Sequence, residues 1–372
     1  MKRFAAAAKR ALRFFTFLLP ALLACCLLWL CNGAQGFADF YTEHLFPALA
    51  APVALVTSLF PFSLTELLCV VSIPGAAVLV AVFIVRLCRG GNRGRTVARG
   101  IRFCGWLLSS AFLAYMLFHG LNFYRNPLWQ TMSLPNTPKT VEQLASVCED
   151  LAKKASAERE GLSEDLEGVM RLSKGIPATL SKTQKVLEQA KNEYPFLRGY
   201  GVRPKGVVLS HLWSYTGITG MYFPFFIESN INIDTSQHTI PHTVCHELAH
   251  TYGFAREDEA NFIGYLLCAA SESQEFRYSG YLAAYVLCSN TLYQYDREAW
   301  EKCVAFESPG VRRDLNAQSR YWSQFQGKVL EVSTSVNDTF LKAQNQQDGV
   351  FSYSRAVALI LAQYEQDGFF AS

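Results

Sequence analysis

The chain has 372 residues, of which 50% are hydrophobic and only 17% are charged, a balance skewed toward membrane proteins. Its formal net charge of +3 is too small to indicate nucleic-acid binding, and no motif that reads DNA or RNA is present. The eleven cysteines include no Cys-x-x-Cys pair, so a thiolate zinc site or a thioredoxin-like motif is unsupported and buried free cysteines are expected.

Three apolar runs are long enough to cross a bilayer as helices. They cover residues 14–31, 64–87 and 103–124. A cleavable signal peptide is the competing interpretation of the first run, but Cys31-Asn32-Gly33-Ala34 is a poor cleavage site. Residues 32–63 are apolar but broken by prolines, and they predict short helices that lie at the membrane surface or dip into it. Residues 1–125 therefore form a predicted membrane domain.

Basic residues cluster at two places that flank these runs. They are Lys2, Arg3, Lys9, Arg10 and Arg13 at the start, and Arg89, Arg93, Arg95, Arg99 and Arg102 in the second loop. Because such loops stay in the cytoplasm, three spans place everything after Tyr124 outside. We expect a multi-pass protein of the cytoplasmic (cell) membrane with its N-terminus inside. His119, within the third run, is expected to hydrogen-bond between helices.

A linker at residues 126–139 leads into a more polar region, residues 140–372, which we expect to form a second domain. Periodicity predicts helices at residues 141–157, 163–173, 177–194, 257–270, 280–306, 309–342 and 355–366. Strands are predicted at residues 206–210, 220–227 and 230–234. The expected fold class is α+β, mostly helical with a small sheet. Pro224 indicates an edge strand, which either holds a peptide substrate along residues 221–234 or is an ordinary sheet edge.

The most informative motif is His-Glu-x-x-His at residues 246–250. On a helix, His246 and His250 stack one turn apart on the same face, where both imidazoles can reach one metal ion. Glu247 lies about 100° round the helix, where it can act as the base for a zinc-bound water. Two nitrogen ligands, an open coordination position and a base are what a zinc hydrolase requires.

A third protein ligand is needed, and it should follow the motif closely. The pattern that places a third histidine six residues after His250 is excluded because that residue is Arg256. Glu257 is the preferred candidate and Glu259 the alternative. Asn261 shares a helix face with Glu257, so it is a candidate to hydrogen-bond a ligand histidine. His242 is too far along the helix to share the ion, and is assigned to the surroundings of the site, to substrate contact or to the helix start.

The sequence His246-Glu247-x-x-His250 followed by Glu257-x-x-Ala260-Asn261 resembles the gluzincin metallopeptidases. It is most similar to CAAX-prenyl proteases and the related bacterial heat-shock membrane proteases. The resemblance implies a zincin-like fold, zinc ligation by His246, His250 and Glu257, and a base role for Glu247. The seven-residue gap before Glu257 is shorter than usual there, and Asn261 stands where that family has Asp.

A wider resemblance is to an uncharacterised bacterial family, a domain of unknown function, whose members have three N-terminal spans and an outward zinc-peptidase-like domain. The matching stretches are Pro61-Phe62-Ser63-Leu64-x-Glu66-Leu67-Leu68, Asn122-x-Tyr124-Arg125, Tyr222-Phe223-Pro224-Phe225, Glu228-x-Asn230-x-Asn232, Glu259-Ala260-Asn261-Phe262 and Asp348-Gly349-Val350-x-Ser352-Tyr353. This resemblance implies a peptidase-like architecture but no particular substrate.

Together these features predict a membrane-anchored zinc metallopeptidase that acts on a peptide or protein. Tyr281, Tyr285 and His242 are candidate donors to the transition state. The alternative is a non-catalytic zinc-binding receptor or scaffold, which would need the ligands but not Glu247. An intramembrane protease is disfavoured because the motif lies far beyond the last apolar run and charged residues follow it.

Overall fold

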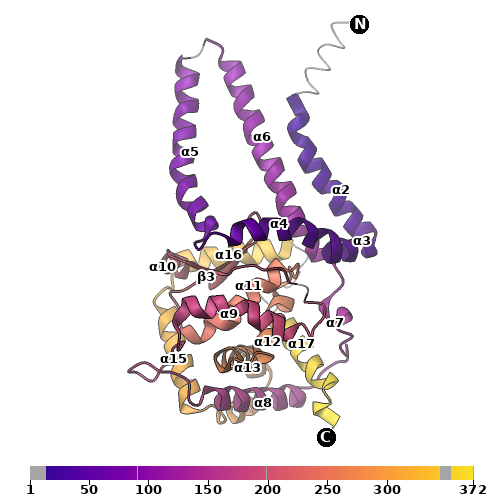
Figure 1. Ribbon diagram of the computed structural model, residues 1–372, viewed down its shortest axis with the longest axis vertical. Helices are drawn as coiled ribbons and strands as arrows, with labels where there is room; N and C mark the ends of the chain where they lie inside the picture. The colour runs from indigo at the N-terminus through magenta and orange to yellow at the C-terminus, as the bar shows by residue number, and fades with distance from the viewer. Residues whose placement is uncertain (1–13, 90, 198, 344–352, 372) are drawn as a thin grey trace.

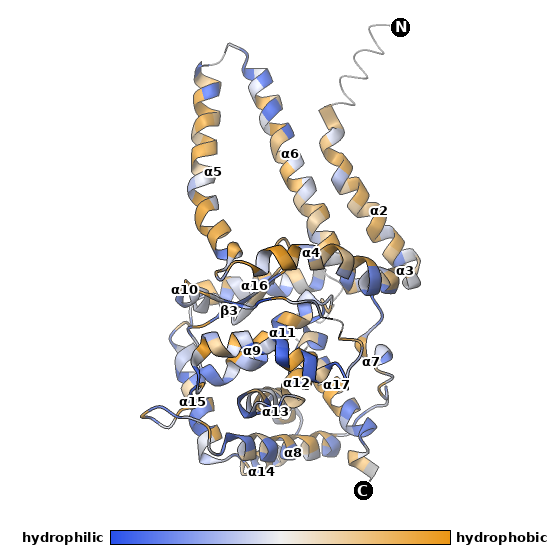
Figure 2. Ribbon diagram, in the orientation of Figure 1, coloured by the Kyte–Doolittle hydropathy of each residue, from blue (hydrophilic) through white to orange (hydrophobic). Residues whose placement is uncertain are grey.

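The computed structural model describes residues 14–89, 91–197, 199–343 and 353–371. Three long apolar helices extend from one side of a helical body (Figure 1). They are the continuous helix Phe15–Gly33, which includes α2 (Leu19–Gly33), α5 (Leu64–Arg89) and α6 (Arg93–Phe118). Each is long and apolar enough to cross a membrane, and Figure 2 shows that hydrophobic residues predominate along them. The basic residues at positions 1–13 and the stretch 348–352 lie outside the described residues.

The third span is displaced from its expected position. Helix α6 begins at Arg93, and its first turns contain the arginines expected in a loop. Asn92 starts the helix early because its side chain accepts a hydrogen bond from the backbone N–H of Arg95. The helix ends at Phe118, and Gly120–Tyr124 form a short 3-10 helix, η3. His119 is therefore the first residue beyond the span.

The segment between the first two spans forms helices that run along the base of the membrane region (Figure 1). These are α3 (Gln35–Phe40), a π-helical turn η2 (Tyr41–Leu45) and α4 (Phe46–Ser58). One face of α4, formed by Phe46, Ala50, Ala54 and Thr57, is buried. The prediction of short helices here is confirmed, and they pack on the body below them.

The sheet has three strands, β1 (Lys205–Val207), β2 (Gly220–Phe223) and β3 (Glu228–Asn232). Their order is β1-β3-β2, with β1 parallel and β2 antiparallel to β3. Strand β2 is therefore an edge strand, and it ends just before Pro224, which cannot donate to a ladder. The predicted α+β fold, mostly helical with a small sheet, is confirmed.

The remaining elements of the body are helical. They are α7 (Leu128–Thr131), α8 (Val141–Arg159), α9 (Gly175–Ala190), α10 (Ser210–Ser214), η4 (Gln237–Thr239), α11 (Ile240–Thr251), α12 (Glu257–Ala269), α13 (Gln274–Tyr295), α14 (Arg297–Val304), α15 (Pro309–Ser323), α16 (Lys328–Ala343), α17 (Tyr353–Gln366) and η6 (Phe369–Ala371). Helix α11 packs against α12, α13, β2 and β3 and so lies at the centre. All eleven cysteines are free, as expected, but only six are buried; the exposed ones are Cys25, Cys26, Cys69, Cys88 and Cys104 on the apolar helices.

Three of the helix predictions were wrong, one in the existence of the helix and two in its extent. Residues 163–173 form a loop, because the Asp165 side chain accepts from the backbone N–H groups of Glu167 and Val169 and closes a turn. The helix predicted at 280–306 is interrupted at Asp296, which caps α14. The helix predicted at 309–342 is interrupted between α15 and α16, where Gly327 has a φ of 150°.

A buried polar network joins the start of α5 to the sheet. Glu228 on β3 forms an ion pair with Lys205 on β1, and both side chains are 1% exposed. The same carboxylate accepts hydrogen bonds from the backbone N–H of Thr65 (2.9 Å) and from its hydroxyl (2.7 Å). Ser63 donates to Asn230 on β3 at 2.6 Å. Glu228 thus satisfies N–H groups at the start of the apolar helix α5 that would otherwise lack partners.

Candidate metal centre

Helix α11 carries the His-Glu-x-x-His motif. Pro241 lies in its first turn, where a missing N–H does no harm, and Gly253, with a φ of 89°, follows its end. Val244, Cys245, Leu248 and Ala249 are fully buried and hold the helix in the core. This packing leaves His246 and His250 together on the face that meets β2 and α12.

The side chains of His246, His250 and Glu257 converge on one point. The Nε2 atoms of the two histidines are 3.1 Å apart. The two carboxylate oxygens of Glu257 lie 3.3 Å from His246 Nε2 and 3.5 Å from His250 Nε2. A tetrahedral ion with bonds of about 2.0–2.2 Å holds its ligand atoms about 3.3–3.5 Å apart. With one ligand atom taken from each residue, the three atoms lie within 4.8 Å of one another, so the cluster is a candidate metal site.

The orientation of His250 is set by a backbone carbonyl. Its Nδ1 lies 2.7 Å from the carbonyl oxygen of Phe254, which can only accept, so Nδ1 carries the proton. Nε2 is then the nitrogen that faces the cluster, as a metal ligand requires. Burial lowers the pKa of His250, but the carboxylates of Glu257 and Glu247 and the hydrogen bond to Phe254 raise that pKa to about 9. In the absence of a metal, Nε2 therefore also carries a proton and pairs with Glu257, and a bound cation would displace this proton.

Glu257 reaches the histidines because α12 packs closely on α11. A side chain at Gly264 would meet His242 Nε2 at 2.9 Å and the backbone nitrogen of His246 at 3.3 Å, so only glycine permits this approach. Burial would raise the pKa of Glu257, but the neighbouring imidazoles, His250 first, hold it well below its usual range. The carboxylate is therefore ionised.

Glu247 does not join the cluster. Its side chain is 4% exposed, and its Oε2 has no hydrogen-bond partner among the described residues. It accepts a hydrogen bond from the backbone N–H of Tyr222 on β2, and burial raises its pKa. A Cβ at Gly220 would lie 2.5 Å from Glu247 Oε1, so glycine at this point of β2 makes room for the carboxylate. Glu247 is thus a buried carboxylate with one oxygen that lacks a partner among the described residues, and it lies beside three convergent side chains.

Glu259, the alternative ligand, points elsewhere. It is 2% exposed, accepts from the backbone N–H of Leu128 at 2.7 Å and pairs with Arg256 at 3.3 Å. It therefore caps α7 and holds the chain leading from the membrane. Asn261 donates to the backbone carbonyl of Glu257 at 2.9 Å, and not to a histidine as expected. Its own carbonyl lies 3.2 Å from His242 Nε2, which keeps His242 outside the cluster.

The model of the family described as "Protein of unknown function (DUF3810)" matches residues 41–361. The chain belongs to this family. No curated protein and no solved structure matches it. The DUF3810 match begins in η2 and ends in α17, so it covers the second and third spans together with the body. The match confirms the predicted family of unknown function, and it gives no information about a reaction or a metal.

Several stretches singled out from the sequence of this DUF3810 chain meet at the junction between spans and body. Ser63 bonds Asn230, and Glu228 bonds Thr65. Asn122 accepts from Thr42 at 3.1 Å, and the guanidinium of Arg125 lies 4.2 Å from the ring centre of Phe254. These residues connect the apolar helices to the body and are not themselves part of the candidate cluster.

Sequence reasoning missed His119. Its ring centre lies 6.1 Å from that of His250 and 5.5 Å from that of Tyr222, at the point where α6 meets the cluster. Its Nδ1 is buried without a hydrogen-bond partner in the described chain. The signal was an ionisable residue in an apolar run, which often marks a functional site. That signal makes it a candidate in principle, but the sequence favours a hydrogen bond between helices, and only the fold brings His119 to α11.

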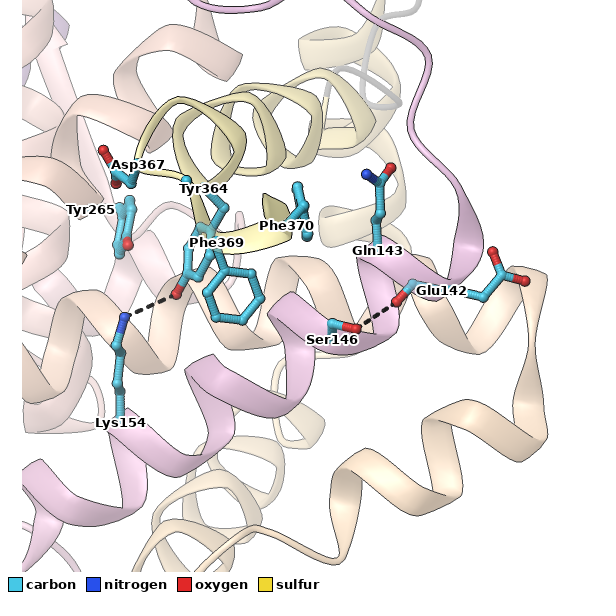
Figure 3. A pocket seen from close by; sticks show the side chains of 10 residues that line it. Glu142, Gln143, Ser146, Lys154, Tyr265, Tyr364, Asp367, Phe369 and Phe370 are labelled. Carbon is cyan, nitrogen blue, oxygen red and sulfur yellow. Dashed lines mark hydrogen bonds between the residues drawn. The ribbon is translucent and has the colours of Figure 1, made fainter. Parts of the chain in front are cut away.

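The tyrosines proposed as donors are engaged elsewhere. The hydroxyl of Tyr285 donates to Glu307 at 2.6 Å. Tyr281 meets Tyr265 edge to face, with ring centres 6.2 Å apart. A cavity of about 710 Å³ lies beside Tyr265, between α8, α12 and the C-terminal segment (Figure 3). Lys154 reaches the Tyr364 hydroxyl within it at 3.4 Å, and none of the cluster residues lines it.

A smaller cavity adjoins the metal cluster. Its volume is about 190 Å³, and it begins at His242 and Thr243 on α11 and at Thr219 before β2. Leu282, Val286, Leu287 and Trp322 also line it.

Proposed function

We propose that this protein is a membrane-anchored, zinc-dependent metallopeptidase. The observation that carries the proposal is the convergence of His246, His250 and Glu257 beside the buried carboxylate of Glu247, whose Oε2 has no partner among the described residues. Two imidazole nitrogens and one carboxylate oxygen suit Zn²⁺ and leave a coordination position open, as in catalytic sites. When bound, the ion would supply Lewis-acid polarisation of the scissile carbonyl and lower the pKa of a water.

The protein's own groups would carry the proton and hold the substrate. Glu247 would accept the proton of the attacking water and pass it to the leaving amine. The edge strand β2 runs directly past Glu247, since Tyr222 donates its N–H to that carboxylate. An extended peptide added along residues 221–234 would therefore place a peptide bond near the base. The cavity at His242 and Thr243 would take a neighbouring side chain.

The receptor or scaffold alternative is disfavoured by the same carboxylate. A structural zinc site needs its ligands but has no use for a buried, partly unsatisfied Glu247. Burying such a group costs stability, so its retention supports a chemical role.

The orientation of the protein is part of the proposal. The turn between α5 and α6, followed by Arg93, Arg95, Arg99 and Arg102, lies at the end of the spans far from the body (Figure 1). The positive-inside rule places this end in the cytoplasm and the body with its metal cluster outside the cell membrane.

The decisive experiment offers a peptide library to the full-length protein in detergent or nanodiscs, with cleavage sites read by mass spectrometry. We expect cleavage by the wild type, abolished by chelation and restored by zinc. Glu247→Gln should bind zinc with the wild-type stoichiometry and cleave nothing. If the wild type binds zinc but leaves the library and added membrane proteins intact, the receptor interpretation replaces the peptidase.

A further inference from the structure

Helix α16 exposes a stripe of apolar side chains that the body leaves uncovered. Val329, Val332, Val336 and Phe340 are 57%, 63%, 63% and 40% exposed. Their spacing of three and four residues places them on one helical face. Helix α16 buries none of the side chains described for it, so contacts with the body hold it only weakly. A helix of this kind is typical of an interface between water and an apolar phase.

The position of α16 indicates which apolar phase its exposed stripe would contact. The ring of Phe340 lies 6.3 Å, centre to centre, from that of Tyr115, and Tyr115 belongs to the span α6. Ser333 holds the same helix to the loop before β2, donating to the carbonyl of Thr216 at 2.9 Å. Helix α16 therefore runs across the side of the body from which α6 leaves, at about the level of α4 (Figure 1).

Helix α4 presents a second exposed apolar face at this level. Leu49, Val56 and Leu59 are 43%, 58% and 73% exposed and are spaced at seven and three residues. The opposite face packs on the body, where the Lys205 ammonium donates to the carbonyl of Thr57 at 2.9 Å. The exposed face therefore points away from the body, on the side of the spans.

We propose that α4 and α16 both lie in the headgroup layer of the bilayer that the three spans cross, with their apolar stripes against lipid. Both helices lie at the same level beside the spans, so a single lipid surface would contact both exposed stripes. The body then sits directly on the membrane. Its metal cluster, reached by His119 one residue after α6 ends, lies at the bilayer surface and not on a distant stalk.

The test uses the full-length protein in nanodiscs, with an environment-sensitive fluorescent amino acid introduced by codon suppression at one position at a time. Val336 and Val56 report on the two stripes. Thr334, also exposed but about 160° round α16 from Val336, is the matched control. Lipids brominated in the upper acyl chain quench only probes that penetrate the interface.

We expect a blue-shifted emission at positions 336 and 56, with about a twofold loss of fluorescence in brominated nanodiscs, and neither effect at position 334. A water-like, unquenched probe at 336 would show that the stripe of α16 lies in solvent, and would overturn the proposal. A blue-shifted but unquenched probe would overturn it too, because protein, such as a second copy of the chain, would then cover the stripe. Neither readout depends on zinc or cleavage, so the result is independent of the proposed peptidase activity.

Discussion

The ring of His119, one residue beyond the apolar helix α6, lies 6.1 Å from the ring of His250 in the candidate metal cluster. Tyr222 packs between the two elements, and its hydroxyl donates to the carbonyl of Phe118 at 2.7 Å. The end of a helix that is long and apolar enough to cross a membrane thus lies beside the candidate centre, together with the edge of the sheet.

His119 is close to the cluster but is not one of its ligands. We expect His119→Gln to retain the wild-type zinc stoichiometry, because none of its atoms belongs to the convergent set. His250→Gln should lose zinc, because it removes a ligand. Changes to the groups that surround the ligands typically lower the metal affinity about 10–100-fold, and removal of a ligand lowers it further. Metal analysis of purified protein distinguishes the two. Loss of zinc in His119→Gln would mean that its imidazole approaches the ion.

The two glutamates that the sequence left open should behave differently. Glu257→Gln should lose zinc while keeping its fold, since its carboxylate contacts only the histidines. Glu259→Gln should keep zinc but unfold at a lower temperature, because it weakens the buried contacts with Leu128 and Arg256. Metal content and thermal unfolding of both variants check this. The reverse pattern of zinc loss would make Glu259 the ligand.

Gly220 should be intolerant of a side chain. A Cβ would lie 2.5 Å from Glu247 Oε1, so Gly220→Ala must displace the carboxylate or β2, at a cost of about 1–3 kcal/mol. We expect normal zinc content and strongly reduced peptide cleavage. Gly201→Ala is the matched control, because nothing lies within 4 Å of its Cβ. Equal activity of the two variants would show that Glu247 does not need its present position.

The Lys205–Glu228 pair should link the stability of the spans and body. Both side chains are buried, so Glu228→Leu alone leaves an uncompensated ammonium and should lower the free energy of unfolding by about 3–5 kcal/mol. The double variant Lys205→Met/Glu228→Leu should recover part of this loss. Thermal unfolding in detergent measures the cycle. Purely additive effects would show that the two charges are not coupled.

Stability should also fall in mild acid because of His238. Burial lowers its pKa below the ordinary 6.5, and it lies 2.9 Å from the Gln318 side chain. The unfolded chain then binds the proton more tightly, so stability is complete above pH 6.5 and decreases as the pH falls through the lowered folded-state value. His238→Gln should flatten the unfolding temperature between pH 7 and 5 relative to the wild type. An unchanged pH profile would place the titration at another group.

The sequence by itself determined the local features of this protein. Apolar runs of sufficient length predicted three helices able to cross a membrane, because a bilayer sets the length of a span. The interval of four between His246 and His250 put both imidazoles on one face of a helix, because the helical repeat does so in any context. Pro224 predicted an edge strand because proline has no N–H to donate to a neighbouring strand.

Only the tertiary structure decided which distant groups meet these local features. Glu257 and Glu259 are both acidic and two residues apart, and only the packing of α12 on α11 at Gly264 turns the first toward the histidines and the second toward Leu128. His119 is 131 residues from His250 in sequence. It reaches the cluster because a buried network anchors α5 to β3 and because Tyr222 bonds the end of α6. Such contacts depend on the relative positions of whole elements, and no periodicity within a single segment encodes them.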